Sequence, residues 1–167
     1  VLVGHSERRT VFTESNGTVA EKFKAAQAAG LTPILCVGET LQQRQQVRTM
    51  EVVAEQIAAV VEQSGLNNVC RAVIAYEPVW AIGSGQAATP DQANDVAAAL
   101  RETIAQVHGS ERAEATRILY GGSVKAANIA SLMKRPDVDG ALVGGASLDV
   151  SEFGSIIQFP KHVTLDS

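Results

Sequence analysis

Hydrophobic residues gather in short, nearly continuous runs along the chain, and longer stretches with helical spacing separate these runs. Each run is almost entirely apolar rather than alternating with polar residues, as expected for parallel strands covered on both faces. The pattern predicts five strands, at Val1–Val3, Thr32–Val37, Ala72–Tyr76, Arg117–Tyr120 and Ala141–Val143.

The stretches between the runs carry helix start and stop signals. Thr18-Val-Ala-Glu21 matches a capping box, in which two side chains satisfy free N–H groups of the first turn, and Gly30 follows as a stop signal. Thr89-Pro-Asp-Gln92 is a second capping box with proline at the first helical position, and Gly109 ends that helix. Two shorter helices are predicted over Ala126–Lys134 and Asp149–Gln158.

Apolar stripes at helical spacing mark the buried face of each predicted helix. Behind the first capping box the stripe is Val19, Phe23 and Ala26. The next stripe is Val47, Met50, Val53, Ile57 and Val60. The helix that begins near Thr89 has the stripe Ala93, Val96, Ala97, Leu100, Ile104 and Val107. We interpret all three stripes as core packing.

No linker, low-complexity tract or shift in composition divides the chain, so residues 1–167 are expected to form a single domain. Strands that alternate with helices predict a parallel sheet with right-handed crossovers. The hydrophobic pattern alone leaves two architectures open, an open doubly wound sheet and a (β/α)8 barrel.

Composition excludes several classes of partner. The 167 residues are 46% hydrophobic and 19% charged with a net charge of −4, and no basic block favours nucleic acid or a membrane surface. No apolar run approaches the ~20 residues of a membrane span. Cys36 and Cys70 lack metal-ligand spacing and are expected to be reduced, buried thiols in a cytoplasmic protein. A start at Val1 without a leader is interpreted as a truncation.

The segment Ala75-Tyr-Glu-Pro-Val-Trp-Ala-Ile-Gly-Ser-Gly85 carries the strongest chemical signal. A buried strand delivers Glu77 at its carboxyl end, and Pro78 stops the strand because proline has no N–H to donate. The loop that follows is unusually apolar for an exposed segment. A carboxylate beside a loop that can cover it suits a general base shielded from water, although a solvated strand-end carboxylate is the common alternative.

Three further motifs follow other predicted strands. Gly4-His-Ser-Glu-Arg-Arg9 follows the first strand, and Tyr120-Gly-Gly-Ser-Val124 and Leu142-Val-Gly-Gly-Ala-Ser-Leu148 end the last two. Glycine pairs between a strand and a short helix let backbone N–H groups approach an anion, but turns use such pairs constantly. If the fold is a (β/α)8 barrel, its active site lies at the carboxyl ends of the strands, and all these motifs fall there.

The four motifs, in this order, resemble those of the triosephosphate isomerase family. The resemblance implies an incomplete (β/α)8 TIM barrel, running from the end of strand 4 to helix 8, and thus about two-thirds of a fold of about 250 residues. It implies the interconversion of dihydroxyacetone phosphate and glyceraldehyde 3-phosphate through an enediolate, with Glu77 as base, His5 as electrophile and no metal or organic cofactor. This family is a standard illustration of tuned acid–base groups and lid closure, so these roles are carried over from it.

By the same resemblance, four residues hold the substrate's phosphate: Gly83, Ser123, Gly144 and Gly145. The carboxylate that matches Glu7 borders the site and contacts a lysine absent from this chain. Arg8 and Arg9 are expected to be a solvated or interface pair without a catalytic role. The family implies a cytoplasmic glycolytic and gluconeogenic enzyme that forms a homodimer and binds neither nucleic acid nor membrane.

Some features depart from the family pattern. The far end of the lid reads Gln86-Ala-Ala88 where Lys-Thr-Ala is commoner, and Ser84 stands where threonine is frequent. The family's first three strands, its substrate-binding asparagine and lysine, and the loop inserted into a partner subunit have no counterpart here. Another phosphate-binding barrel isomerase or aldolase would lack the apolar lid. A non-catalytic phosphate-binding or assembly fragment remains the alternative from another class.

Overall fold

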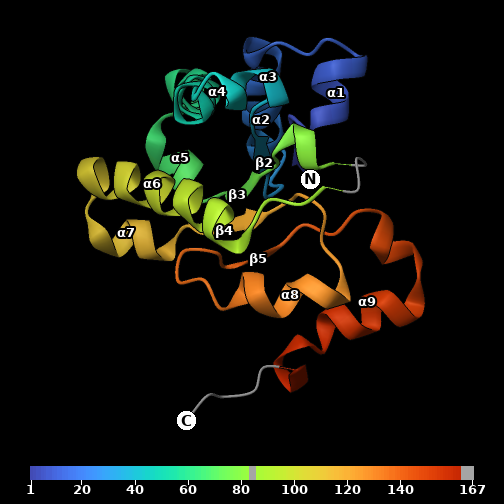
Figure 1. Ribbon diagram of the computed structural model, residues 1–167. Coiled ribbons are helices and arrows are strands. Elements are labelled where there is room, and N and C mark those ends of the chain that lie inside the picture. The colour runs from blue at the N-terminus through green and yellow to red at the C-terminus, as the bar shows by residue number, and fades with distance from the viewer. Residues whose placement is uncertain (83–85, 163–167) are drawn as a thin grey trace.

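The computed structural model describes residues 1–82 and 86–162 (Figure 1). Within these residues five parallel strands form one sheet, and their spatial order is the order of the sequence. The strands are β1 (Leu2–Val3), β2 (Ile34–Val37), β3 (Val73–Tyr76), β4 (Arg117–Tyr120) and β5 (Gly140–Ala141). Doubly wound sheets reverse their strand order at a switch point, whereas barrels do not. The sequential order therefore selects the barrel, here open between β1 and β5.

Helices follow the strands and lie in an arc around the sheet, with α2, α4, α6 and α8 in succession (Figure 1). The described α-helices are α1 (Ser6–Val11), α2 (Asn16–Ala28), α3 (Leu41–Gln45), α4 (Thr49–Ser64), α5 (Leu66–Cys70), α6 (Pro90–His108), α7 (Ser110–Ala115), α8 (Ala126–Met133) and α9 (Val150–Ile157). Short 3₁₀ turns occupy Val79–Ala81, Gly145–Leu148 and Phe159–His162. None of the helices in the described ranges is long and apolar enough to cross a membrane.

The core lies between the sheet and this arc of helices. Its fully buried side chains come from strands and helices alike: Val19, Phe23, Leu35, Val53, Val60, Ile74, Ile118 and Leu132. Tyr76 and Tyr120 face each other on neighbouring strands, with ring centroids 6.5 Å apart and an interplanar angle of 56°. Burial of these aliphatic and aromatic surfaces is the main force that holds the βα units together.

The second strand begins two residues later in the structure than the sequence pattern predicted. Ile34 is the first residue of β2, and its N–H donates to Val1 O at 2.7 Å. Thr32 lies outside the strand because Pro33, which follows it, has no N–H for the ladder. The last strand was also predicted a little late, at Ala141–Val143, whereas β5 is Gly140–Ala141.

The first predicted capping box is wrong by one turn. Helix α2 begins at Asn16, with Ser15 as its N-cap and the Ser15 hydroxyl accepting from Thr18 N at 3.2 Å. Thr18 therefore lies inside the first turn. The second capping box is confirmed, because Thr89 caps α6 and exchanges hydrogen bonds with Gln92, and Gly109 ends the helix with φ 83°.

Three residues assigned to buried stripes are exposed, namely Val47, Met50 and Val107, and Met50 is the least exposed of them at 38%. Val107, near the end of α6, is 63% exposed because the helix has passed the edge of the core there. Val47 is 91% exposed and precedes α4 altogether, in the turn between α3 and α4. Its φ of 59° lies in the left-handed region, which a β-branched side chain rarely adopts.

Replacing Val47 by glycine is expected to stabilise the protein by about 1 kcal/mol. Relief of left-handed strain at a β-branched residue outweighs the extra freedom that glycine gives the unfolded chain, and almost no buried surface is lost. Denaturant unfolding of the two proteins measures the change. Val107→Gly is the matched control and should destabilise, since it places glycine in a helix. Destabilisation of the protein by Val47→Gly would argue against backbone strain at Val47.

Arg101 joins α6 to the loops that flank β4 and β5. It is 7% exposed and donates to Ala113 O at 2.6 Å, Thr116 O at 3.2 Å and Asp137 O at 3.1 Å. Its guanidinium also pairs with Asp137 and Asp139. Asp139 in turn accepts from the Ile118 amide at 2.7 Å, so one buried cation fixes the approach of the last two strands.

Candidate functional site

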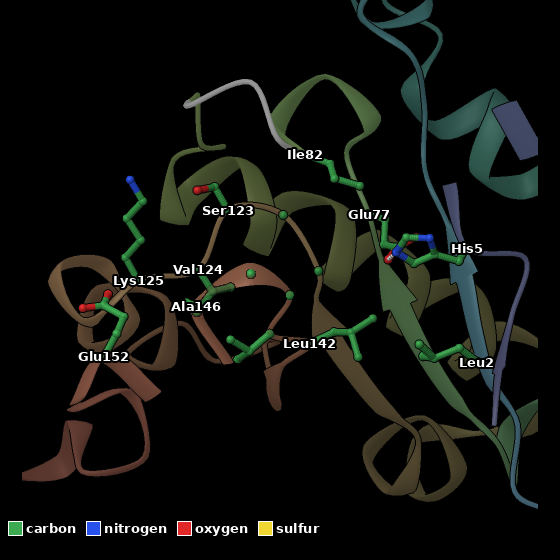
Figure 2. Close-up of a pocket in the computed structure, with 15 residues that line it drawn as sticks. Leu2, His5, Glu77, Ile82, Ser123, Val124, Lys125, Leu142, Ala146 and Glu152 are labelled. Atoms are coloured by element: carbon green, nitrogen blue, oxygen red, sulfur yellow. Dashed lines mark ion pairs between the residues drawn. The ribbon is translucent and has the colours of Figure 1, made fainter. Parts of the chain in front are cut away.

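Most of the predicted site residues meet at the carboxyl ends of the strands. A cavity of about 680 Å³ opens there, and His5, Glu77, Ser123, Gly144 and Gly145 all line it (Figure 2). They come from the loops after β1, β3, β4 and β5. Gly83 lies outside the described residues.

Glu77 is a buried carboxylate held on two sides. Its side chain is 3% exposed, and Oε2 accepts from the Ser6 amide at 3.1 Å. Oε1 lies 3.2 Å from His5 Nε2. The Glu77 amide donates to Val37 O at 2.7 Å, which continues the β2–β3 ladder to this residue. The carboxylate is therefore positioned by the end of the sheet rather than by a free loop.

Two glycines make room for Glu77. A Cβ on Gly38 would lie 1.9 Å from Glu77 O, and a Cβ on Gly121 would lie 2.8 Å from Glu77 Cγ. Gln56 fixes Gly38 by donating to its carbonyl at 3.0 Å and accepting from its amide at 2.8 Å. Any side chain at Gly38 would displace the backbone that carries the carboxylate.

Burial raises the pKa of Glu77 above that of an exposed carboxyl. Interactions with His5, the Ser6 amide, Cys36 and Arg9 oppose this effect but do not cancel it. A raised pKa makes the carboxylate a stronger base than an exposed glutamate, because a proton bound to it is held more tightly.

His5 is the N-cap of α1, and its ring is fixed by its own helix. The Glu7 amide donates to His5 Nδ1 at 3.3 Å, so the proton of the neutral ring stands on Nε2. That N–H points at Glu77 Oε1. The neutral ring therefore presents a hydrogen-bond donor to the cavity beside the carboxylate (Figure 2).

The stability difference between the wild type and Glu77→Gln is expected to depend on pH. The folded-state pKa of Glu77 is raised, so its contribution to stability is fully present below the unfolded carboxyl pKa and is lost as pH rises through the folded value. The amide does not titrate. The free energy of unfolding of Glu77→Gln should therefore rise relative to that of the wild type as pH increases from about 4.

Urea unfolding of both proteins at several pH values between about 4 and 8 measures this gap. Titrating groups that do not contact Glu77 are shared by the two proteins, so their contributions cancel in the difference. A gap that stays constant across the range would contradict a raised pKa at Glu77.

Glu39 organises the near end of the loop after Glu77, and the sequence patterns did not reveal it. It is fully buried, and its carboxylate accepts from Tyr76 Oη at 3.1 Å, Trp80 Nε1 at 2.9 Å and Arg44 at 3.1 Å. The Arg44 guanidinium also stacks over the Trp80 ring at 4.7 Å. One signal was available, since Glu39 closely follows a buried strand, much as Glu77 follows the next one.

Tyr120 holds the far end of the same loop. Its hydroxyl accepts from the Ala88 amide at 3.1 Å, and burial raises the pKa of the phenol. Gly122 allows this arrangement, because a Cβ there would lie 2.1 Å from Tyr120 Oη. Strand β4 thus anchors the residues that lead into α6, and the variant Gln86-Ala-Ala88 sequence keeps the backbone N–H that this anchor needs.

Gly144 and Gly145, which line the cavity away from Glu77, differ from the glycines that make room for packed protein atoms. A Cβ on Gly144 or Gly145 would meet no protein atom within 4 Å, unlike one on Gly38, Gly121 or Gly122. The space beside them belongs to the cavity. Gly144 O accepts from both the amide and the hydroxyl of Ser147, at 2.8 and 2.7 Å, which fixes the turn. Packing does not demand glycine here, so the open space favours a ligand that approaches the backbone.

Arg9 is not the solvated residue that was one of the two expectations for it, and its expected place in an interface stays a prediction. Its guanidinium is half-buried and donates to Gly4 O at 2.8 Å, Asn16 Oδ1 at 2.7 Å and Cys36 O at 3.4 Å. It ties the loop after β1 to β2. Arg8 is exposed, stacks on Phe12 and pairs with Glu14 at 2.5 Å.

Both cysteines are free, with Cys36 buried and Cys70 half-buried, and burial raises the pKa of the Cys36 thiol. Across residues 1–82 and 86–162, no group of three or more metal-ligating side chains comes together.

Comparison with known proteins gives a consistent result. A family model described as triosephosphate isomerase matches residues 1–160. The triosephosphate isomerases of Pseudomonas fluorescens Pf0-1 and Nitrosomonas europaea are 57% and 58% identical to the chain over 156 residues. That of Pseudomonas aeruginosa PAO1 is 55% identical. Each alignment covers 93% of this chain and 62% of the relative, so the chain spans about three-fifths of the length of the curated relatives it matches.

Proposed function

The chain belongs to the triosephosphate isomerase family, and we propose from this premise that its full-length protein interconverts dihydroxyacetone phosphate and glyceraldehyde 3-phosphate. The observation that carries the proposal is the pairing of the buried Glu77 carboxylate with the half-buried His5 ring in the cavity at the strand ends. The full-length protein means this chain together with the residues that the relatives have and this chain lacks.

Glu77 acts as the base in this proposal. It removes a proton from the carbon next to the substrate carbonyl and returns it to the neighbouring carbon, while the hydroxyl proton of the substrate passes to the former carbonyl oxygen, so the ketose becomes the aldose. Its raised pKa suits a group that must accept a proton and then release it near neutral pH. Ile82 lines the cavity close to Glu77 in Figure 2, where an apolar side chain excludes water from the base.

His5 acts as the electrophile. Its Nε2–H, now directed at Glu77, donates instead to the substrate oxygen on which negative charge develops. A donor that is already oriented stabilises that charge without reorganisation during the reaction. Substrate must enter between the two side chains, which exchanges their mutual contact for contacts to the reacting atoms.

The phosphate is held mainly by backbone on the opposite wall. The open space beside Gly144 and Gly145 and the position of Ser123 support an anion site at this end of the cavity. Gly83 is a further predicted contact. No metal or cofactor has a role in this mechanism.

We also propose that residues 1–167 form the C-terminal part of one (β/α)8 barrel domain. The partial coverage of the relatives and the open sheet support an incomplete barrel, and the C-terminal assignment follows from the resemblance of the four motifs and their order. A cytoplasmic location, a part in glycolysis and gluconeogenesis, and a homodimer of the full-length protein remain finer parts of the proposal and follow from the family alone.

The variant His5→Gln tests the proposal in the full-length protein. It is expected to lower kcat in a coupled isomerase assay by about 10²-fold, because the donor to the developing oxyanion is lost. The matched control is Gln63→His, which places an imidazole on the outer surface of α4 and should leave kcat unchanged.

Two results would separate the rival functions. Equal turnover by the wild type and His5→Gln would make His5 structural. Phosphate binding without any turnover by the wild type would favour the non-catalytic phosphate-binding alternative.

A further inference from the structure

The cavity has a charged end that no predicted role uses. Lys125 and Glu152 both line it, at the end away from His5 and Glu77 (Figure 2). Lys125 caps α8 and comes directly after Ser123-Val124, whereas Glu152 belongs to the first turn of α9. Two elements far apart in sequence therefore bring opposite charges to the wall where the phosphate is proposed to bind.

The two side chains are held differently. Glu152 is fixed, because its Oε1 accepts from the Ala126 amide at 2.7 Å. The Lys125 side chain is exposed, and within the described residues its ammonium has no ion pair with a carboxylate. In Figure 2 its ammonium extends to the level of the Ser123 hydroxyl rather than towards Glu152. The cation is thus available to an incoming ligand, while the carboxylate is already engaged.

The charge of Lys125 stands out among the residues that line the cavity. Among the described residues that line the cavity, Lys125 is the only lysine or arginine, and Glu77 and Glu152 are the acidic ones. The 167 residues carry a net charge of −4, so this part of the protein repels an anionic substrate, and one cation that lines the cavity offsets that repulsion locally.

We propose that Lys125 and Glu152 are opposed specificity-determining residues that set how strongly the site attracts a phosphorylated substrate. Lys125 accelerates the capture of the dianion, and Glu152 limits it. This inference rests on the proposed function of the site and deepens it. Neither side chain touches the reacting atoms, so the pair acts on association and leaves the proton transfers unchanged.

The test compares Lys125→Gln, Glu152→Gln and Lys125→Arg in the full-length protein. At about 0.01 M ionic strength, Lys125→Gln should lower kcat/KM about three- to ten-fold with kcat unchanged, since a charge acting on a dianion at roughly 8 Å is worth that factor in water. Glu152→Gln should raise kcat/KM by a similar factor, because the amide keeps the acceptor for Ala126. Lys125→Arg should retain the wild-type value.

Salt distinguishes attraction from a structural role. The effects should shrink as ionic strength rises to about 0.15 M and the Debye length falls from about 30 Å to about 8 Å. Lys134→Gln is the matched control, since Lys134 is an exposed lysine at the other end of α8 and should have no effect. A Lys125→Gln effect that is independent of salt, falls on kcat, or is matched by Lys134→Gln would overturn the proposal.

Inorganic phosphate provides a readout that does not need turnover. Its dissociation constant, followed by NMR titration, should rise in Lys125→Gln and fall in Glu152→Gln by similar factors. These shifts in a protein that does not isomerise triose phosphates would uphold the inference and refute the proposed function. Normal turnover with unchanged phosphate affinity and kcat/KM in both variants would uphold the proposed function and refute the inference about Lys125 and Glu152.

Discussion

Glu77→Asp in the full-length protein is expected to lower kcat by about 10²-fold and to change KM far less. The reason is distance, since the shorter side chain withdraws the carboxylate by about one methylene and ~1 Å of misplacement can cost ~10²-fold in rate. The backbone cannot compensate, because Gly38 packs against Glu77 O and the β2–β3 ladder continues to Glu77 N. Coupled isomerase kinetics in both directions measure the change.

The control for this variant is Glu62→Asp, which makes the same substitution on the exposed face of α4. Its kcat should match the wild type. An unchanged kcat in Glu77→Asp, with normal unfolding behaviour, would remove Glu77 from the role of base.

The 167-residue chain by itself is expected to have less than about a thousandth of the isomerase activity of the full-length protein. By family resemblance it lacks the lysine that neutralises the substrate, and the loss of one such partner typically costs 10²–10³-fold. Within the described residues β1 and β5 are unpaired sheet edges, and Val1 and Leu2 are 56% and 45% exposed. Unpaired edges and uncovered apolar side chains favour aggregation or partial order.

A coupled assay on the purified chain, alone and after addition of the missing N-terminal part, measures this expectation. Circular dichroism and gel filtration on the same samples show whether structure returns with activity. The mixture should regain activity and the chain alone should not. Activity of the chain alone near that of the full-length protein would mean that the missing strands contribute little to the site.

Much of the fold could be predicted because parallel strands covered on both faces leave continuous apolar runs. All five runs became strands, and Thr89 and Gly109 marked the ends of α6 as predicted. The errors lie where a local signal competed with another. Ser15 outcompeted Thr18 as a helix cap, and Val47 continued an apolar stripe into a turn. The short helices α1, α3, α5 and α7 were missed because five or six residues carry too little periodicity.

The predicted site residues came from local motifs, but the contacts that support them join distant segments. The motif around Glu77 gave the carboxylate, and the motif around His5 gave the imidazole. Neither could show that Gly38 makes room for the carboxylate or that Glu39 gathers Tyr76, Trp80 and Arg44. Such roles depend on which loops the barrel brings together, and one sequence does not record them as a spacing.

The order of the strands has a consequence for how the protein is made. In the part of the chain described, each strand pairs only with strands adjacent to it in the sequence. A nascent polypeptide can therefore add one strand-and-helix unit at a time to the edge already formed, without waiting for residues still inside the ribosome. Synthesis then proceeds with one growing edge, while the outer edge of the first strand also stays open until the barrel closes. The time for which these edges stay unpaired sets the interval in which the emerging protein is most exposed to aggregation.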